Sequence, residues 1–141
     1  MPRSSNQKLK ILYIMDHLLR NTDENHPATT AQLVAMLDGH GISAERKSIY
    51  DDLEALRTYG LDILSTGSGR SSGYYVGSRE FQLPELKLLV DSIQSSKFIT
   101  EGKSMELIAK LETLASRHEA EFLHRQIHVA NRVKTMNESI Y

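Results

Sequence analysis

Apolar residues recur at helical spacing through the first part of the chain. From Asn6 to Arg20 they fall at positions i, i+1, i+4, i+7 and i+8, which places them on one side of a helix. Ser4 and Gln7 have the spacing of a capping box at the start of this segment. The pattern therefore predicts a helix over residues 6–20. Its predicted buried face is Ile11, Leu12, Met15, Leu18 and Leu19.

Two shorter helices are predicted next, on either side of Gly39-His40-Gly41. Thr29 and Gln32 again have capping-box spacing, and the face behind them is Thr30, Leu33, Val34 and Leu37. Ser43 is a candidate N-cap for the third helix, and Gly60 a candidate glycine at its end. The predicted buried side of that third helix is Ile49, Leu53 and Leu56.

The period then changes to that of β-strands. Leu61–Ser65 and Tyr74–Val76 are short β-prone runs on either side of a Gly- and Ser-rich loop, which predicts a β-hairpin. Three helices followed by a two-stranded hairpin is the order of a winged helix-turn-helix. In that fold the third helix reads DNA and the hairpin is the wing. We therefore expect residues 1–78 to form a winged helix-turn-helix domain.

Residues 79–141 are almost entirely helix-periodic. Pro84 suits the first turn of a helix, a second helix is predicted near Lys103 to Ser116, and Ser116 with Glu119 opens a short third one. We interpret this region as a helical connector, which makes the fold class mainly α (α+β). Its predicted buried residues are Leu86, Leu89, Val90, Ile93, Phe98, Leu107, Ile108, Leu111, Leu114, Phe122 and Leu123.

The third helix carries residues that suit DNA recognition. At about 100° per residue, with Ile49 at the buried centre, Lys47 and Asp51 lie about 160° away and face outward. Small, hydrogen-bonding and cationic side chains here suit base edges and phosphates. Cations oppose the dipole at a helix N-terminus, which favours a functional reason over a stabilising one, with a solvated face as the alternative. The predicted DNA-binding residues of this helix are Ala44, Arg46, Lys47, Ser48, Tyr50 and Asp51.

Composition narrows the function classes. The 141 residues include 17 Lys and Arg against 18 Asp and Glu, a net charge of −1, whereas small nucleic-acid binders are usually basic. The chain has no Cys, no apolar run near the roughly 20 residues that span a bilayer, and no secretory signal. We therefore expect a cytoplasmic protein with no membrane partner.

Catalytic and ligand motifs are weak. The chain has no G-x-S-x-G nucleophile elbow between a strand and a helix and no H-E-x-x-H motif, and Asp51 and Asp52 point about 100° apart, so we expect no enzyme and no cofactor. Asp52 lies nearer the buried side, where we expect it to bond to a cap or a backbone amide. His124 and His128 could ligate a metal, but surface histidines explain them equally well, and no metal site is predicted.

The glycine-rich loop between the predicted strands has two interpretations. It could cradle a phosphate, but such a loop needs a helix directly after it, and Tyr74 opens a strand instead. The loop is therefore interpreted as the wing tip. Arg70 at this tip is predicted to contact the DNA backbone or minor groove.

Several segments resemble one known family. Ile49–Leu56 with Tyr59–Ile63 resembles the recognition helix and first wing strand of the WYL-domain transcriptional regulators, and Gly73–Val76 resembles their second wing strand. The helical segment after the wing is also similar, at Phe81–Asp91, Ser95–Thr100, Lys103, Ser104, Leu107, Ile108, Lys110 and Leu111. The last similarity is to the segment that leads into the WYL domain of these regulators, at Arg132, Lys134, Thr135 and Asn137–Tyr141.

The resemblance implies a transcriptional regulator that binds double-stranded DNA, and a homodimer for the full-length protein. The chain stops at Tyr141, where the family begins its WYL domain, so we expect the effector-sensing part to be absent. Asp51 stands where family members often carry a basic or small polar residue. A carboxylate there repels phosphate but could accept from cytosine N4. Asp51 and the near-neutral charge favour an alternative, a winged-helix protein–protein interaction module, whereas Arg46, Lys47 and Arg70 favour DNA.

Overall fold

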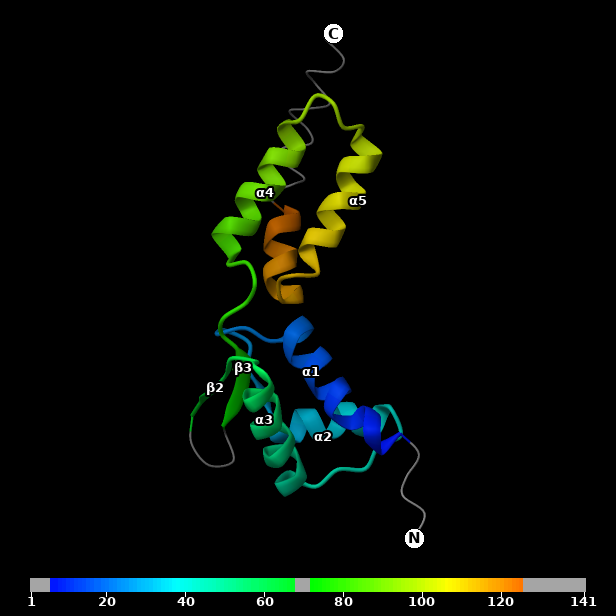
Figure 1. Cartoon of the computed structure of the whole chain (residues 1–141), viewed down its shortest axis with the longest axis vertical. Helices are drawn as coiled ribbons and strands as arrows, with labels where there is room; N and C mark the ends of the chain where they lie inside the picture. The colour runs from blue at the N-terminus through cyan, green and yellow to red at the C-terminus, as the bar shows by residue number, and fades with distance from the viewer. Residues whose placement is uncertain (1–5, 68–71, 126–141) are drawn as a thin grey trace. The chain divides into compact units, whose positions relative to one another are not determined.

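A computed structural model of the chain describes residues 6–67 and 72–125 (Figure 1). The fold is mainly helical with a small antiparallel sheet, and the chain divides into two compact units, Met1–Arg79 (unit 1) and Glu80–Tyr141 (unit 2). No helix in the described ranges is long and apolar enough to cross a membrane. The elements of unit 1 are η1 (Gln7–Leu9), α1 (Lys10–Asn21), β1 (Ala28–Thr29), α2 (Thr30–Gly39), α3 (Arg46–Tyr59), β2 (Ile63–Thr66) and β3 (Gly73–Val76).

The predicted hairpin is part of a larger sheet. β2 and β3 pair antiparallel, with Ile63 opposite Val76, and β1 adds a third strand on the other side of β3, with Ala28 opposite Tyr74. The order is therefore β1-β3-β2 rather than a sheet of two strands. β1 has only two residues, too few to show an alternating pattern, so the sequence could not reveal it.

One core unites the helices and strands of unit 1. The predicted faces of α2 and α3 are confirmed, because Leu33, Leu37, Ile49, Leu53 and Leu56 are all buried. Ile42 from the α2–α3 connection and Ile63 and Val76 from the hairpin complete the cluster.

The predicted face of α1 is confirmed for four of its five residues, because Leu18 is buried and Ile11, Met15 and Leu19 pack against the core. Leu12 is the exception at 51% exposed, and Ile14, which was not predicted, is fully buried. Residues 11–15 are all apolar, so periodicity alone did not decide the centre of the buried face. A second correction concerns Ser43, because the N-cap of α3 is Glu45, without a side-chain cap. Ser4 lies outside the described residues. The Thr29–Gln32 capping box is confirmed.

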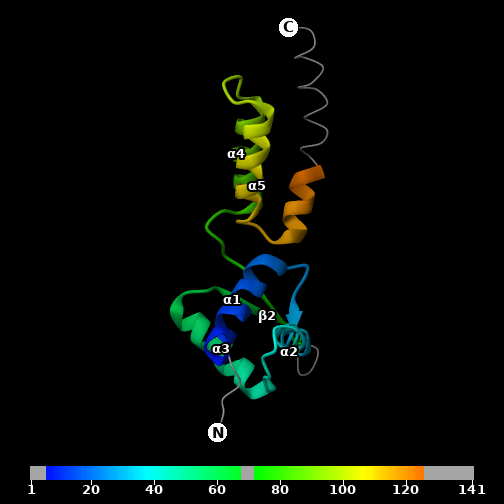
Figure 2. The same cartoon turned by 90° about the vertical axis from the view of Figure 1, so that its right-hand side faces the viewer.

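Unit 2 begins with a helical hairpin. α4 (Leu83–Ser95) and α5 (Glu101–Glu112) run antiparallel, and a further helical stretch, 117–125, lies beside them (Figures 1 and 2). Gln82 and Glu85 form a capping box at α4, with Pro84 in its first turn as predicted. The buried apolar residues here are Leu86, Val90, Ile108, Ala115 and Leu123.

Three residues predicted to be buried in unit 2 lie on its surface. α4 ends at Ser95, so Phe98 stands in the connection to α5 and is 99% exposed. Leu114 follows the end of α5, and Phe122 lies on the outer side of the last helical stretch; both are exposed. For Phe98 and Leu114 the prediction failed because it extended the helical period past the true helix ends; Phe122 lies within a helical stretch but on its outer side.

Candidate nucleic-acid interface

Helix α3 presents a polar outer face. Burial of Ile49, Leu53 and Leu56 fixes its inner side, while Arg46 at the helix start and Lys47, Tyr50 and Asp51 further round the helix are exposed. The first turn of α3 contains two cations and no acidic residue; the carboxylates nearest in sequence are those of the N-cap Glu45 and of Asp51 in the next turn. Cations at a helix N-terminus oppose the dipole, so this arrangement does not stabilise the helix.

The other predicted residues have different settings. Ala44 precedes α3 and packs, half-buried, against the core of unit 1. Ser48 is half-buried, and its hydroxyl donates to the Glu45 carbonyl at 3.0 Å, which occupies its donor within the chain. Arg70 lies outside the described residues. The structure therefore brings Arg46, Lys47, Tyr50 and Asp51 together on one exposed helix face.

An ion pair fixes the orientation of α3 against α1. The ammonium of Lys10 binds the Asp52 carboxylate, and the two side chains are 10% and 21% exposed. The same Nζ lies 3.5 Å from the Ser48 carbonyl oxygen. Asp52 was expected to bond to a cap or a backbone amide; its partner is instead a side chain from another helix. Such a long-range pair leaves no mark in the local sequence pattern.

Tyr74 joins the hairpin to the two helices of the candidate site. Its ring meets the Tyr50 ring edge-on, with centroids 6.5 Å apart and planes inclined at 61°. Its hydroxyl faces the side chain of Thr30, the first residue of α2. Partial burial, and then the neighbouring Tyr50, raises the pKa of the Tyr74 phenol above its ordinary value; Thr30 and the charges of Arg57 and Arg46 act in the opposite direction. Sequence analysis assigned Tyr74 only to a strand.

Arg57 ties the far end of α3 to the sheet. Its Nε donates to the Ile63 carbonyl at 3.0 Å, and its Nη1 lies 3.6 Å from a Glu54 carboxylate oxygen. Lys47 differs, since no hydrogen bond or ion pair holds it within residues 6–67 and 72–125. Its ammonium therefore remains available to a ligand.

The chain leaves the hairpin through a fixed segment. The backbone N–H groups of Gly77 and Ser78 donate to Asp62, at 2.9 and 2.8 Å. The guanidinium of Arg79 donates to the carbonyls of Leu19 and Thr22 at the end of α1, both at 2.6 Å. A side chain at position 77 would approach Leu64 and Asp62 within 3 Å, which explains the glycine. These bonds hold the end of β3 against the helices.

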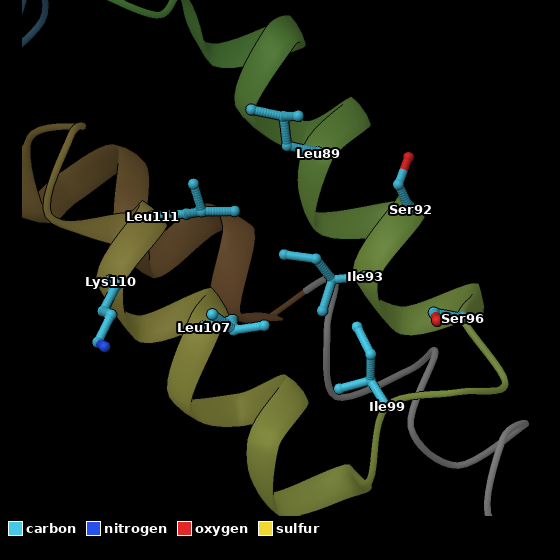
Figure 3. Close-up of a pocket in the computed structure, with 8 residues that line it drawn as sticks. All are labelled: Leu89, Ser92, Ile93, Ser96, Ile99, Leu107, Lys110 and Leu111. Carbon is cyan, nitrogen blue, oxygen red and sulfur yellow. The ribbon is translucent and has the colours of Figure 1, made fainter.

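An apolar groove lies between α4 and α5 of unit 2 (Figure 3). Its volume is about 480 Å³, and Lys110 is its one charged lining residue. It therefore offers no acid–base pair. Its lining residues are Leu89, Ser92, Ile93, Ser96, Ile99, Leu107, Lys110 and Leu111.

Only one histidine of the pair considered as a metal site lies among the described residues. His124 Nδ1 lies 3.3 Å from a Glu112 carboxylate oxygen, and His128 lies outside the described residues. Among the residues that the structure describes, no group of three or more His, Asp or Glu side chains is placed to hold a metal ion.

Comparisons with known proteins do not assign the chain to a family. No protein-family model matches it, and no curated protein or solved structure matches it significantly. Its function is therefore inferred from its own residues and their geometry.

Proposed function

We propose that residues 1–78 form a winged helix-turn-helix domain that binds double-stranded DNA. In this proposal α3 enters the major groove and the β2–β3 hairpin approaches the backbone or minor groove. The observation that carries the proposal is the exposed first turn of α3, where two cations, Arg46 and Lys47, stand at the N-terminus of the helix. Charge that opposes the helix dipole is explained by a phosphate ligand and not by stability.

The anchoring of α3 also supports this role. Sequence readout requires a helix held in one orientation, since its side chains must meet base edges in register. The core beneath Ile49, Leu53 and Leu56, the Lys10–Asp52 pair and the Arg57 bond to β2 fix α3 along its length. On the sequence resemblance, we further propose that the protein is a transcriptional regulator of the WYL type, dimeric at full length.

Asp51 supports a second candidate, a winged-helix protein–protein interaction module. Its carboxylate is exposed beside the two cations and would repel phosphate, and the net charge of the chain is −1. The two candidates differ in salt dependence. A protein that binds DNA releases counterions from the phosphates, and added salt lowers the free energy gained by this release, so binding weakens steeply.

The test measures binding of the full chain to random duplex DNA by fluorescence anisotropy over a range of salt concentrations. Lys47→Ala and Arg46→Ala should each weaken binding to all sequences and lower the salt slope by about one. Both side chains are exposed, so the thermal midpoint should not change. Lys87→Ala, an exposed charge removal on α4, is the matched control and should bind normally.

Two results would overturn the proposal. One is that the wild-type chain shows no salt-dependent binding to duplex DNA. The other is that the Arg46→Ala, Lys47→Ala double variant binds as tightly as the wild type.

A further inference from the structure

Tyr50 occupies the middle of the exposed face of α3. Its side chain is 40% exposed, and its aromatic ring is the largest apolar group on this face. Arg46 and Lys47 precede it by four and three residues, so all three side chains are neighbours on the helix surface. The cations end long flexible stems that can reach toward phosphates, whereas Tyr50 presents a rigid ring between them.

Tyr74 holds that ring from one side. Tyr74 belongs to the central strand β3, where its backbone stands between Ala28 of β1 and Ser65 of β2. Its ring meets Tyr50 edge-on. A side chain whose backbone is paired on both sides is a firm support. The Tyr50 ring is therefore positioned before any ligand arrives, which reduces the entropy lost on binding.

We propose that Tyr50 is a specificity-determining residue whose ring contacts a thymine C5-methyl group in the major groove, with Tyr74 as its positioning residue. This inference rests on the proposed DNA-binding function. Thymine alone presents a methyl group on the major-groove edge, and apolar side-chain carbons are what recognise it. The contact with Tyr74 positions the ring of Tyr50 and not its hydroxyl. We therefore assign base recognition to the ring.

The experiment starts from duplexes that the full chain selects from a random pool. In the selected sequence each thymine is replaced in turn by deoxyuracil, which removes one methyl group and leaves base pairing intact. For the wild type, at least one replacement should weaken binding about fourfold, the value of one buried methyl-sized group. Tyr50→Phe should keep this difference, and Tyr50→Ala should abolish it.

Three further variants test the assigned roles. Tyr59→Ala removes a tyrosine that is 79% exposed at the end of α3, and as the matched control it should keep the thymine–uracil difference. Tyr74→Ala should reduce the difference while the salt slope stays unchanged, and Tyr74→Phe, which keeps the ring, should restore it. A thermal midpoint is measured for each variant; if Tyr74→Ala does not fold, the Tyr50 variants still decide the assignment.

The inference fails if no thymine-to-uracil replacement affects binding, or if Tyr50→Ala keeps the difference. It also fails if Tyr50→Phe weakens binding equally to all sequences, because the hydroxyl would then be contacting phosphate. If the wild type selects no duplex at all, the proposed DNA-binding function itself fails, and this result is distinct from the others.

Discussion

The two units bury their apolar side chains in different ways. In unit 1 a single cluster extends through α1, α2, α3 and both strands of the hairpin. In the described part of unit 2 the buried residues form two small clusters, and Leu88 and Phe98 are 67% and 99% exposed. Because apolar burial is the main driving force of folding, unit 1 has the larger share of stability per residue.

The two units also differ in their polar contacts. Unit 1 is connected by bonds between residues distant in sequence, such as Lys10 with Asp52 and Arg79 with Leu19. In unit 2, Lys103 and Lys110 pair with Glu106 within the single helix α5, and Glu112 contacts His124 of the stretch 117–125; such surface pairs contribute little. A rigid unit therefore carries the candidate DNA interface, and a looser helical unit follows it.

The largest test compares core truncations in the two units. Leu53→Ala should destabilise unit 1 by about 2–5 kcal/mol, and Ile108→Ala should cost less, since its small cluster can collapse around the missing atoms. Urea unfolding is followed by two probes. Tyrosine fluorescence reports on unit 1, because every tyrosine except Tyr141 lies there, and circular dichroism reports on the whole chain. Coincident transitions with equal losses would contradict the comparison.

A smaller effect is expected from the ion pair between α1 and α3. Asp52→Ala leaves the ammonium of Lys10 nearly buried without its partner and should cost about 1–3 kcal/mol in the free energy of unfolding. Glu106→Ala on α5 is the matched carboxylate removal and should change it by no more than about 1 kcal/mol. A double-mutant cycle with Lys10→Met measures the coupling, and a coupling near zero would show that the pair does not hold α3.

The smallest effect is expected at Phe98. Its side chain makes almost no buried contact, so Phe98→Ser should change the free energy of unfolding by no more than about 0.5 kcal/mol. Leu86→Ala on the neighbouring helix α4 provides the buried comparison and should cost several times more. A large loss from Phe98→Ser would mean that unit 2 is packed as tightly as unit 1.

The spacing of apolar residues predicted the features that depend on neighbours along the chain, such as the buried side of a helix. Ile49, Leu53 and Leu56 form a helical stripe with polar residues between them, so the buried side of α3 followed from the sequence. Phe98 continued the spacing of α4 but lies beyond the helix end at Ser95, and periodicity does not register where a helix stops.

The contacts that shape the candidate site could not be predicted in this way. The outward positions of Lys47, Tyr50 and Asp51 follow from helix geometry alone. The partners that hold the site, Lys10 for Asp52 and Tyr74 for Tyr50, come from elements far along the chain. Their meeting depends on the packing of the whole unit, which no local spacing encodes.

The central place of β3 sets the order in which a growing chain can complete unit 1. During synthesis α1, β1, α2 and α3 all leave the ribosome before β3. Until then β1 and β2 lack the strand that pairs with them, and Thr22 Oγ1 lacks the Val76 N–H that donates to it. A chain interrupted before Gly73 would therefore present two unpaired strand edges to its neighbours, a known route to aggregation. A chain interrupted after Arg79 would already have closed its sheet and tied the strand end to α1.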